Sequence, residues 1–135
     1  MIKLSKEKPY EDACKILGLR PVANYKSYKL TDETRNFIKL ETVAKALNEG
    51  WKPTTIDPKE VRYYVWGWNY TDNRKPAGLL DVSSSSGLGD ASAPVGTSLE
   101  FKDRDTAKEF ARMCKPMIVK YLFGRDDHEN FKFDF

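Results

Sequence analysis

The sequence predicts an α+β domain: a three-stranded antiparallel sheet with two N-terminal helices and a long C-terminal helix. Apolar residues recur at helical spacing over 37–47 and again over 107–121, whereas 61–70 is dense in β-branched and aromatic residues at a spacing of two. A chain of 135 residues also suits one core. We therefore expect a single domain over residues 1–124 and a charged, phenylalanine-rich tail over 125–135.

Two helices are expected in the N-terminal part of the chain. The first is predicted to start at Pro9, which suits the first helical position, and to stop at Gly18, which adopts a left-handed conformation easily. The second is predicted to follow Thr31, a good N-cap residue, and to stop at Gly50. Its apolar residues recur at steps of three and four and form one stripe, which consists of Phe37, Leu40, Ala44 and Leu47.

Strands are predicted over 61–70, 78–84 and 98–102, where β-forming residues dominate. Because these three strands follow one another in the chain, antiparallel pairing is expected. A serine- and glycine-rich loop over 83–98 separates the last two strands. A loop of this length in a small domain is typical of a functional or mobile segment, and we expect 85–97 to be the most mobile internal part.

The third helix is predicted from Asp103, a good N-cap residue, to Gly124. Its apolar stripe keeps helical phase for four turns and consists of Ala107, Phe110, Ala111, Cys114, Met117, Ile118 and Tyr121. Pro116 lies inside the stripe. Because the helical phase continues beyond the proline, the sequence predicts one kinked helix rather than two separate helices.

Composition excludes several classes of protein. The net charge is +3, from 23 basic and 20 acidic residues that are interspersed, which is mild for a duplex-DNA binder. The longest apolar runs contain only a few residues, far fewer than the ~20 that a membrane span needs. The N-terminus is polar and resembles no secretory signal. We therefore expect a soluble cytoplasmic protein that does not bind membranes.

Few residues are candidates for catalysis or metal binding. His128 is the single histidine, and Cys14 and Cys114 both fall on apolar sides of predicted helices, so we expect buried free thiols rather than a disulfide or a zinc site. The serines at 83–86 lack the glycines of a nucleophile elbow, and the glycine pair at 87–89 lacks the rest of a nucleotide-binding motif. The sequence predicts no enzyme, no catalytic residue, no metal and no cofactor.

The aromatic strand carries the strongest indication of a binding site. Its large aromatic side chains share one face at a spacing of two, where they could stack on the bases of single-stranded nucleic acid or on a nucleotide. Basic residues on this face and in the following turn could contact phosphates. The candidate binding residues are Arg62, Tyr64, Trp66, Trp68, Tyr70, Arg74 and Lys75. The alternative is that this face packs beneath the third helix as part of the core.

Three phenylalanines alternate with polar residues in the tail, at Phe131, Phe133 and Phe135. One interpretation is an added strand that closes the edge of the sheet. A second is a linear motif that docks on a partner protein. A frayed terminus is the third. The residues themselves do not rank the first two.

Several strings of residues resemble a group of small uncharacterised proteins from tailed phages and mobile elements of gut bacteria. The resemblance covers roughly residues 10–121. It rests on Glu11-Asp12-Ala13-Cys14-Lys15, Leu17-Gly18, Lys39-Leu40-Glu41, Ala46-Leu47-Asn48-Glu49-Gly50-Trp51-Lys52-Pro53, Tyr63-Tyr64-Val65-Trp66, and Leu99-Glu100-Phe101-Lys102 before Ala107. This chain differs at Val65, where proline is common in the group, and in its additional phenylalanine-rich tail. The resemblance implies a phage-like origin and no mechanism.

The leading functional hypothesis is a phage-like accessory protein that binds single-stranded nucleic acid or a nucleotide without catalysing a reaction. One alternative is a virion or assembly protein, for which the 83–98 loop and the tail would be docking elements. Another is an inhibitor of a host protein. If the chain is phage-encoded, it would act in the host cytoplasm or in the virion.

Overall fold

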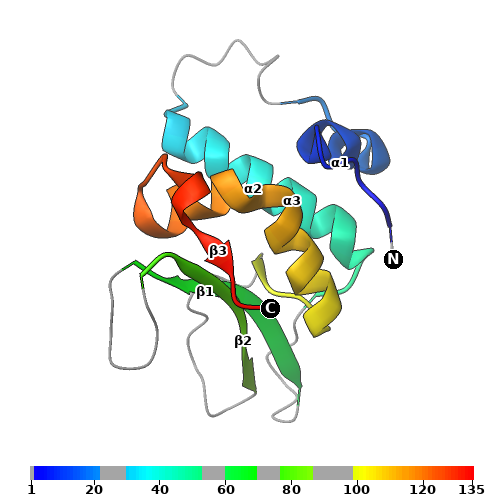
Figure 1. Ribbon diagram of the computed structural model, residues 1–135. Coiled ribbons are helices and arrows are strands. Elements are labelled where there is room, and N and C mark those ends of the chain that lie inside the picture. The colour runs from blue at the N-terminus through cyan, green and yellow to red at the C-terminus, as the bar shows by residue number, and fades with distance from the viewer. Residues whose placement is uncertain (1, 22–29, 53–59, 70–76, 87–98) are drawn as a thin grey trace.

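The computed structural model of the chain describes residues 2–21, 30–52, 60–69, 77–86 and 99–135. Its helices lie on one side of a small sheet, and the C-terminal segment returns to the sheet in front of α3 (Figure 1). The elements in chain order are α1 (Pro9–Leu17), α2 (Asp32–Asn48), β1 (Val61–Trp68), β2 (Leu79–Ser86), α3 (Arg104–Phe123), the short 3-10 helix η4 (His128–Asn130) and β3 (Lys132–Phe133). The α+β class is confirmed.

Most of the residues that cap the helices are the predicted ones, but the cap of α2 lies one residue before the predicted Gly50. Helix α1 starts at Pro9 and is followed by Gly18 in the left-handed conformation. The Thr31 hydroxyl accepts a hydrogen bond from the Thr34 N–H at 3.1 Å, and so caps α2. At the end of α2 the first left-handed residue is Glu49, with φ 49°. Each cap satisfies backbone groups that the helix leaves without a partner.

Helix α3 is one element with a kink. The Asp103 carboxylate accepts the Thr106 N–H at 2.7 Å, and Gly124 ends the helix in the left-handed conformation. Between them, Cys114 has non-helical angles, φ −116° and ψ 21°. Pro116 follows two residues later, where it lacks an N–H donor and its ring crowds the preceding turn. The predicted kinked helix is confirmed.

The sheet is mixed, with the strand order β1-β2-β3. Strands β1 and β2 are antiparallel, and Val65 lies opposite Val82. Strand β3 is parallel to β2, and the N–H of Lys132 donates to the Gly78 oxygen at 2.7 Å. The expectation of a wholly antiparallel sheet is therefore wrong. The third strand comes from the C-terminal tail, which reaches β2 after α3 has crossed the sheet, and this crossing reverses the direction of approach.

The strand expected over 98–102 is reduced, in the described part of the chain, to one antiparallel bridge between Tyr63 and Phe101. The two residues exchange backbone hydrogen bonds of 2.9 and 2.8 Å on the edge of β1 away from β2. Asp103 already caps α3 two residues later, so the chain has no length left to extend this pairing.

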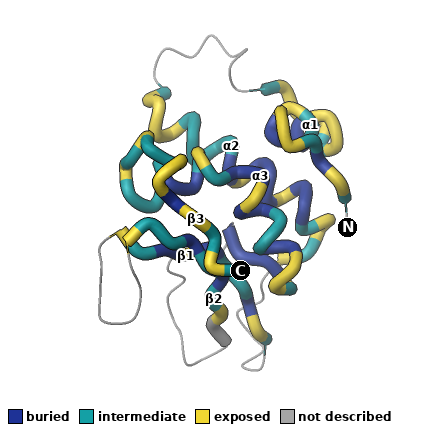
Figure 2. The backbone as a smooth tube through the Cα atoms, in the orientation of Figure 1, coloured by how far each residue is buried: buried dark blue, intermediate teal, exposed yellow. Residues whose placement is uncertain are grey.

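The core lies where α2, α3 and the sheet meet, as the buried segments in Figure 2 show. The rings of Phe101 and Phe110 contact each other there, with centroids 4.9 Å apart. Cys14 and Cys114 are both buried free thiols, which confirms the sequence prediction. Burial raises the pKa of the Cys114 thiol to about 12. None of the helices in the described ranges is both long and apolar enough to cross a membrane.

Candidate binding surface

The two faces of β1 lie in different environments because successive side chains of a strand point to opposite sides of the sheet. Val65 faces the helices and is 4% exposed. Its neighbour Trp66 faces away from them and is 39% exposed. Tyr64 and Trp68 share the face of Trp66 and are half-buried. The aromatic face is therefore not the one that packs beneath α3, and we refer to it as the outer face.

Gly67 allows the helix-side face of β1 to be closely packed. A Cβ atom at this position would lie 2.7 Å from the Leu79 oxygen and 2.8 Å from the Leu80 side chain. It would also lie 3.1 Å from the ring of Phe123 at the end of α3. Contacts this short force neighbouring atoms to move. The glycine therefore lets the end of α3 approach the helix side of β1 closely. Its neighbours in sequence, Trp66 and Trp68, point to the outer face.

A row of side chains crosses the outer face from β1 to β3. Trp66 lies directly opposite Asp81 in the antiparallel register. The N–H of Asp134 donates to the Leu80 oxygen at 2.7 Å, which places Asp134 beside Asp81. One Asp81 carboxylate oxygen accepts the N–H of Val82 at 2.8 Å. The half-exposed indole is therefore next to carboxylates on this face.

Arg62 and Glu100 form a buried ion pair on the same side of the sheet. Arg62 Nε lies 3.6 Å from Glu100 Oε2, and the Glu100 side chain is fully buried. Neither carboxylate oxygen of Glu100 accepts a hydrogen bond from the part of the chain that the structure describes. Burial raises the pKa of Glu100, and nearby Glu60 raises it further, while Arg62 partly offsets both. Arg62 is thus held beside a buried carboxyl group and is not a surface cation.

The structure gathers only part of the predicted nucleic-acid site. Strand alternation puts Tyr64, Trp66 and Trp68 on one side of β1, where Trp66 is exposed and Tyr64 is partly buried against the core. The remaining candidates Tyr70, Arg74 and Lys75 lie outside the described residues. So does the 87–97 part of the segment 85–97 that is predicted to be the most mobile, whereas its first two residues belong to β2.

The tail forms the sheet edge, in agreement with the first interpretation of its alternating phenylalanines. Phe131 is fully buried and stacks on Phe123 with ring centroids 5.2 Å apart. Phe133 and Phe135 stack on each other at 5.0 Å and pack beside α3. A role of these residues in docking a partner remains a prediction.

Three cations of α3 hold the last two phenylalanines. Lys115 Nζ lies 5.5 Å from the centre of the Phe133 ring. Lys108 and Arg112 lie 5.6 and 5.2 Å from the centre of the Phe135 ring. These cations were not among the predicted site residues. Their spacing of four and three residues places them on one helical stripe, which was the available signal.

Arg125 fixes the turn that leads into β3. Its guanidinium donates to the Asp127 carboxylate through Nε at 2.8 Å and through Nη2, and its Nη1 donates to Asn69 Oδ1 at 2.8 Å. Asn130 also donates to Asp127, at 2.9 Å. These bonds hold the pKa of Asp127 well below its usual range. The cluster thereby connects the end of β1 to the turn before β3.

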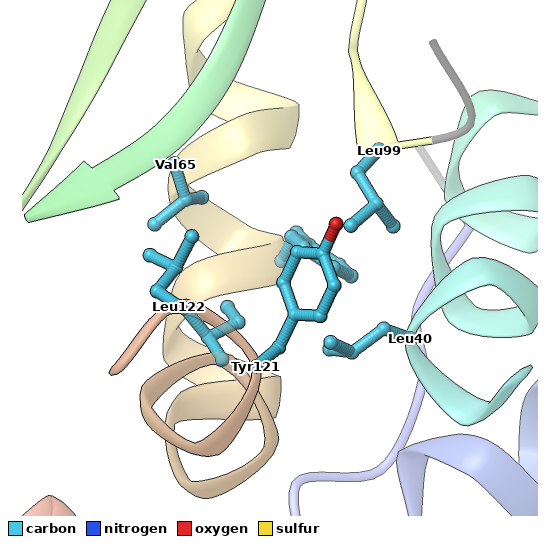
Figure 3. A pocket seen from close by; sticks show the side chains of 7 residues that line it. Leu40, Val65, Leu99, Tyr121 and Leu122 are labelled. Carbon is cyan, nitrogen blue, oxygen red and sulfur yellow. The ribbon is translucent and has the colours of Figure 1, made fainter. Parts of the chain in front are cut away.

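Two hollows lie among residues that the structure describes. The first is an apolar void of about 10 Å³, which is at the limit for one water molecule (Figure 3). The second is a groove of about 210 Å³ at the end of α2 and the start of α3, which includes Trp51 and Lys102. Its Asp103 already caps α3, and its Asn48 donates to the Glu100 backbone oxygen at 3.0 Å. No group of three potential metal ligands occurs in the described ranges.

Comparison with protein-family models, with curated proteins and with solved structures returned no match to this chain.

Proposed function

We propose that the protein is a non-enzymatic binding protein and that its outer face contacts a positively charged segment of a partner protein. The observation that carries this proposal is Trp66, which is 39% exposed and lies opposite Asp81. Exposed tryptophans dominate the binding energy of many protein interfaces. An indole next to carboxylates provides two kinds of attraction for a lysine or arginine side chain.

The same charges argue against a phosphate backbone at this place. Asp81 and Asp134 lie in the row that contains Trp66, and like charges at an interface oppose association. Arg62, which the sequence analysis assigned to phosphate contacts, is paired with buried Glu100. Lys132 also lies on the outer face, but in the neighbouring row, where it pairs with Leu79 opposite Trp68. The described outer face therefore supports a cationic protein segment better than a single-stranded nucleic acid.

A protein partner for the outer face changes which of the sequence-based hypotheses is favoured. It keeps the non-enzymatic binding protein and replaces the nucleic acid with a protein, which also suits a virion assembly protein or an inhibitor of a host protein. The phage-like origin remains a prediction that rests on the resemblance alone.

The test uses the full chain and two probes, a short peptide of alternating lysine and alanine and an oligothymidylate. Intrinsic tryptophan fluorescence is followed as each probe is added. We expect the lysine peptide to change the emission, and Trp66→Ala to weaken its binding by about tenfold or more. Asp81→Asn is expected to weaken it less, with a smaller salt dependence, because one attractive charge is lost.

Glu41→Gln is the matched control, since it also removes one exposed carboxylate but lies on α2. It should leave the affinity unchanged. Binding of oligothymidylate in preference to the lysine peptide, with loss on Trp66→Ala, would overturn the proposal in favour of nucleic acid. Equal effects of Asp81→Asn and Glu41→Gln would overturn the assignment of the outer face.

A further inference from the structure

Strand β3 has one paired edge and one open edge. The N–H groups of Lys132 and Asp134 donate to β2, at Gly78 and Leu80. Phe133 lies between them, so its N–H and C=O point away from β2. In the residues that the structure describes, β3 is the terminal strand and nothing pairs with it on that side. Such an open edge is a template for another extended chain.

Cations surround this open edge on both sides of the sheet. Lys108, Arg112 and Lys115 lie on the helix side, over the rings of Phe133 and Phe135. Lys132 is exposed and alternates with Phe133, so it belongs to the opposite side.

These cations have little internal compensation. Arg112 is 3.5 Å from Glu109 in a partly exposed pair. Within the described ranges, neither Lys108 nor Lys115 forms an ion pair with a carboxylate, and each lies over a phenylalanine ring. Positive charge therefore dominates the helix side of the edge at fixed positions, whereas the outer side carries Lys132 together with Asp134.

We propose that the open edge of β3 binds an extended acidic peptide segment of a partner protein as an additional strand. The backbone of the segment pairs with Phe133. Its side chains alternate between the two sides of the sheet, so carboxylates at one parity meet Lys115 and those at the other meet Lys132.

The surroundings of the edge select a peptide over a nucleic acid. Bases that bind to aromatic residues need an accessible ring face. Phe135 is stacked on Phe133 and has Lys108 and Arg112 over its ring, so its faces are already occupied. A free backbone N–H and C=O also match a peptide strand and have no counterpart in a nucleic acid.

This inference is independent of the proposed function, since Trp66 lies on β1 and β3 is separated from it by β2. Variants at the two surfaces therefore report separately. If Lys115→Glu weakens binding of the acidic peptide and Trp66→Ala does not, the peptide binds at β3 and not at the outer face of β1.

The experiment titrates the full chain into fluorescently labelled peptides of about eight residues, a usual strand length. The first peptide carries glutamate at most positions, so that both sides of the added strand present carboxylates. The second carries lysine at the same positions, and the third is the first with alternate backbone nitrogens methylated. We expect the unmethylated glutamate peptide to bind much more tightly than its methylated form, and added salt to weaken it. The lysine peptide reports on the outer face instead, so Lys115→Glu should not weaken its binding. Lys115→Glu should lower its affinity by about tenfold or more, because attraction becomes repulsion.

Lys6→Glu makes the same charge change in the exposed N-terminal segment and should not alter binding. Thermal unfolding checks that Lys115→Glu is folded, and Lys132→Glu at an exposed position serves as a second variant if it is not. Equal binding of the methylated peptide would overturn strand pairing, since methylation keeps every charge and removes the donors. Equally tight binding of oligothymidylate would overturn the assignment of a peptide.

Discussion

Val65 and Trp66 are neighbours in β1, yet one is 4% exposed and the other 39% exposed. Val65 lies among side chains of α2 and α3, including Leu40 and Phe110, around the small void in Figure 3. Trp66 lies opposite Asp81 on the outer face. The difference assigns separate roles to the two faces of one strand. Changes on the helix side should lower the free energy of unfolding, whereas changes on the outer face should alter binding.

The largest effect is expected for Phe110→Ala on the helix side. Phe110 is buried and packs against Phe101, so its truncation removes apolar contacts and leaves a cavity. The free energy of unfolding should fall by about 3–5 kcal/mol. Urea denaturation measures this loss, and Phe110→Leu should cost clearly less. A loss below about 1 kcal/mol would show that the core is not where the comparison places it.

Arg62→Met tests whether the outer face is uniform. Arg62 lies on the same side as Trp66 but is buried against Glu100. Removal of its charge leaves a buried carboxyl group without its cation, so we expect a loss of about 3 kcal/mol by urea denaturation at neutral pH. Arg62→Lys should retain part of the stability. A negligible loss would mean that the whole outer face behaves like Trp66.

Glu100→Gln tests the buried ion pair through the pH dependence of stability. Burial raises the pKa of Glu100 above its usual 4.5, so the folded protein binds its proton more tightly than the unfolded chain. Stability should therefore fall as the pH rises from about 4.5 through the raised pKa. The glutamine variant lacks this proton, and its urea midpoint should change less with pH over that window. Identical pH profiles for the two proteins would contradict the raised pKa.

The smallest effect on stability is expected for Trp66→Ala. Because much of the indole is exposed, its removal should change the free energy of unfolding by only about 0.5 kcal/mol. The same variant is expected to lose binding to the cationic peptide. A fall in stability comparable to that of Phe110→Ala would remove the distinction between the two faces.

The sequence was sufficient for features that depend on neighbouring residues. The caps at Thr31 and Asp103 and the kink near Pro116 arise within a few residues of chain, and all three are present. The parallel pairing of β3 could not be predicted because its partner, β2, lies about fifty residues away in the chain. The direction of β3 is set only by the course of α3 between them. The 98–102 strand was overestimated because Asp103 begins a helix at its end.

The candidate surfaces were predictable to a similar degree. Alternation places Tyr64, Trp66 and Trp68 on one side of the strand, but it could not show that Arg62 meets Glu100, which comes from a distant segment. In the sequence, the cations of α3 resemble those of an ordinary solvated helix face. Their role in holding the tail depends on the contact of Lys108 with the Phe135 ring, which no local sequence pattern predicts.

The two buried thiols provide a native readout of local opening. Cys14 lies in α1, and Cys114 lies at the kink of α3. An alkylating reagent reaches such a sulfur only when the surrounding segment separates from the core, so the labelling rate measures how often that happens. With a pKa of about 12, Cys114 also contains little reactive thiolate while it stays enclosed. Labelling followed residue by residue would therefore show whether α1 detaches before α3 loosens, without any introduced probe.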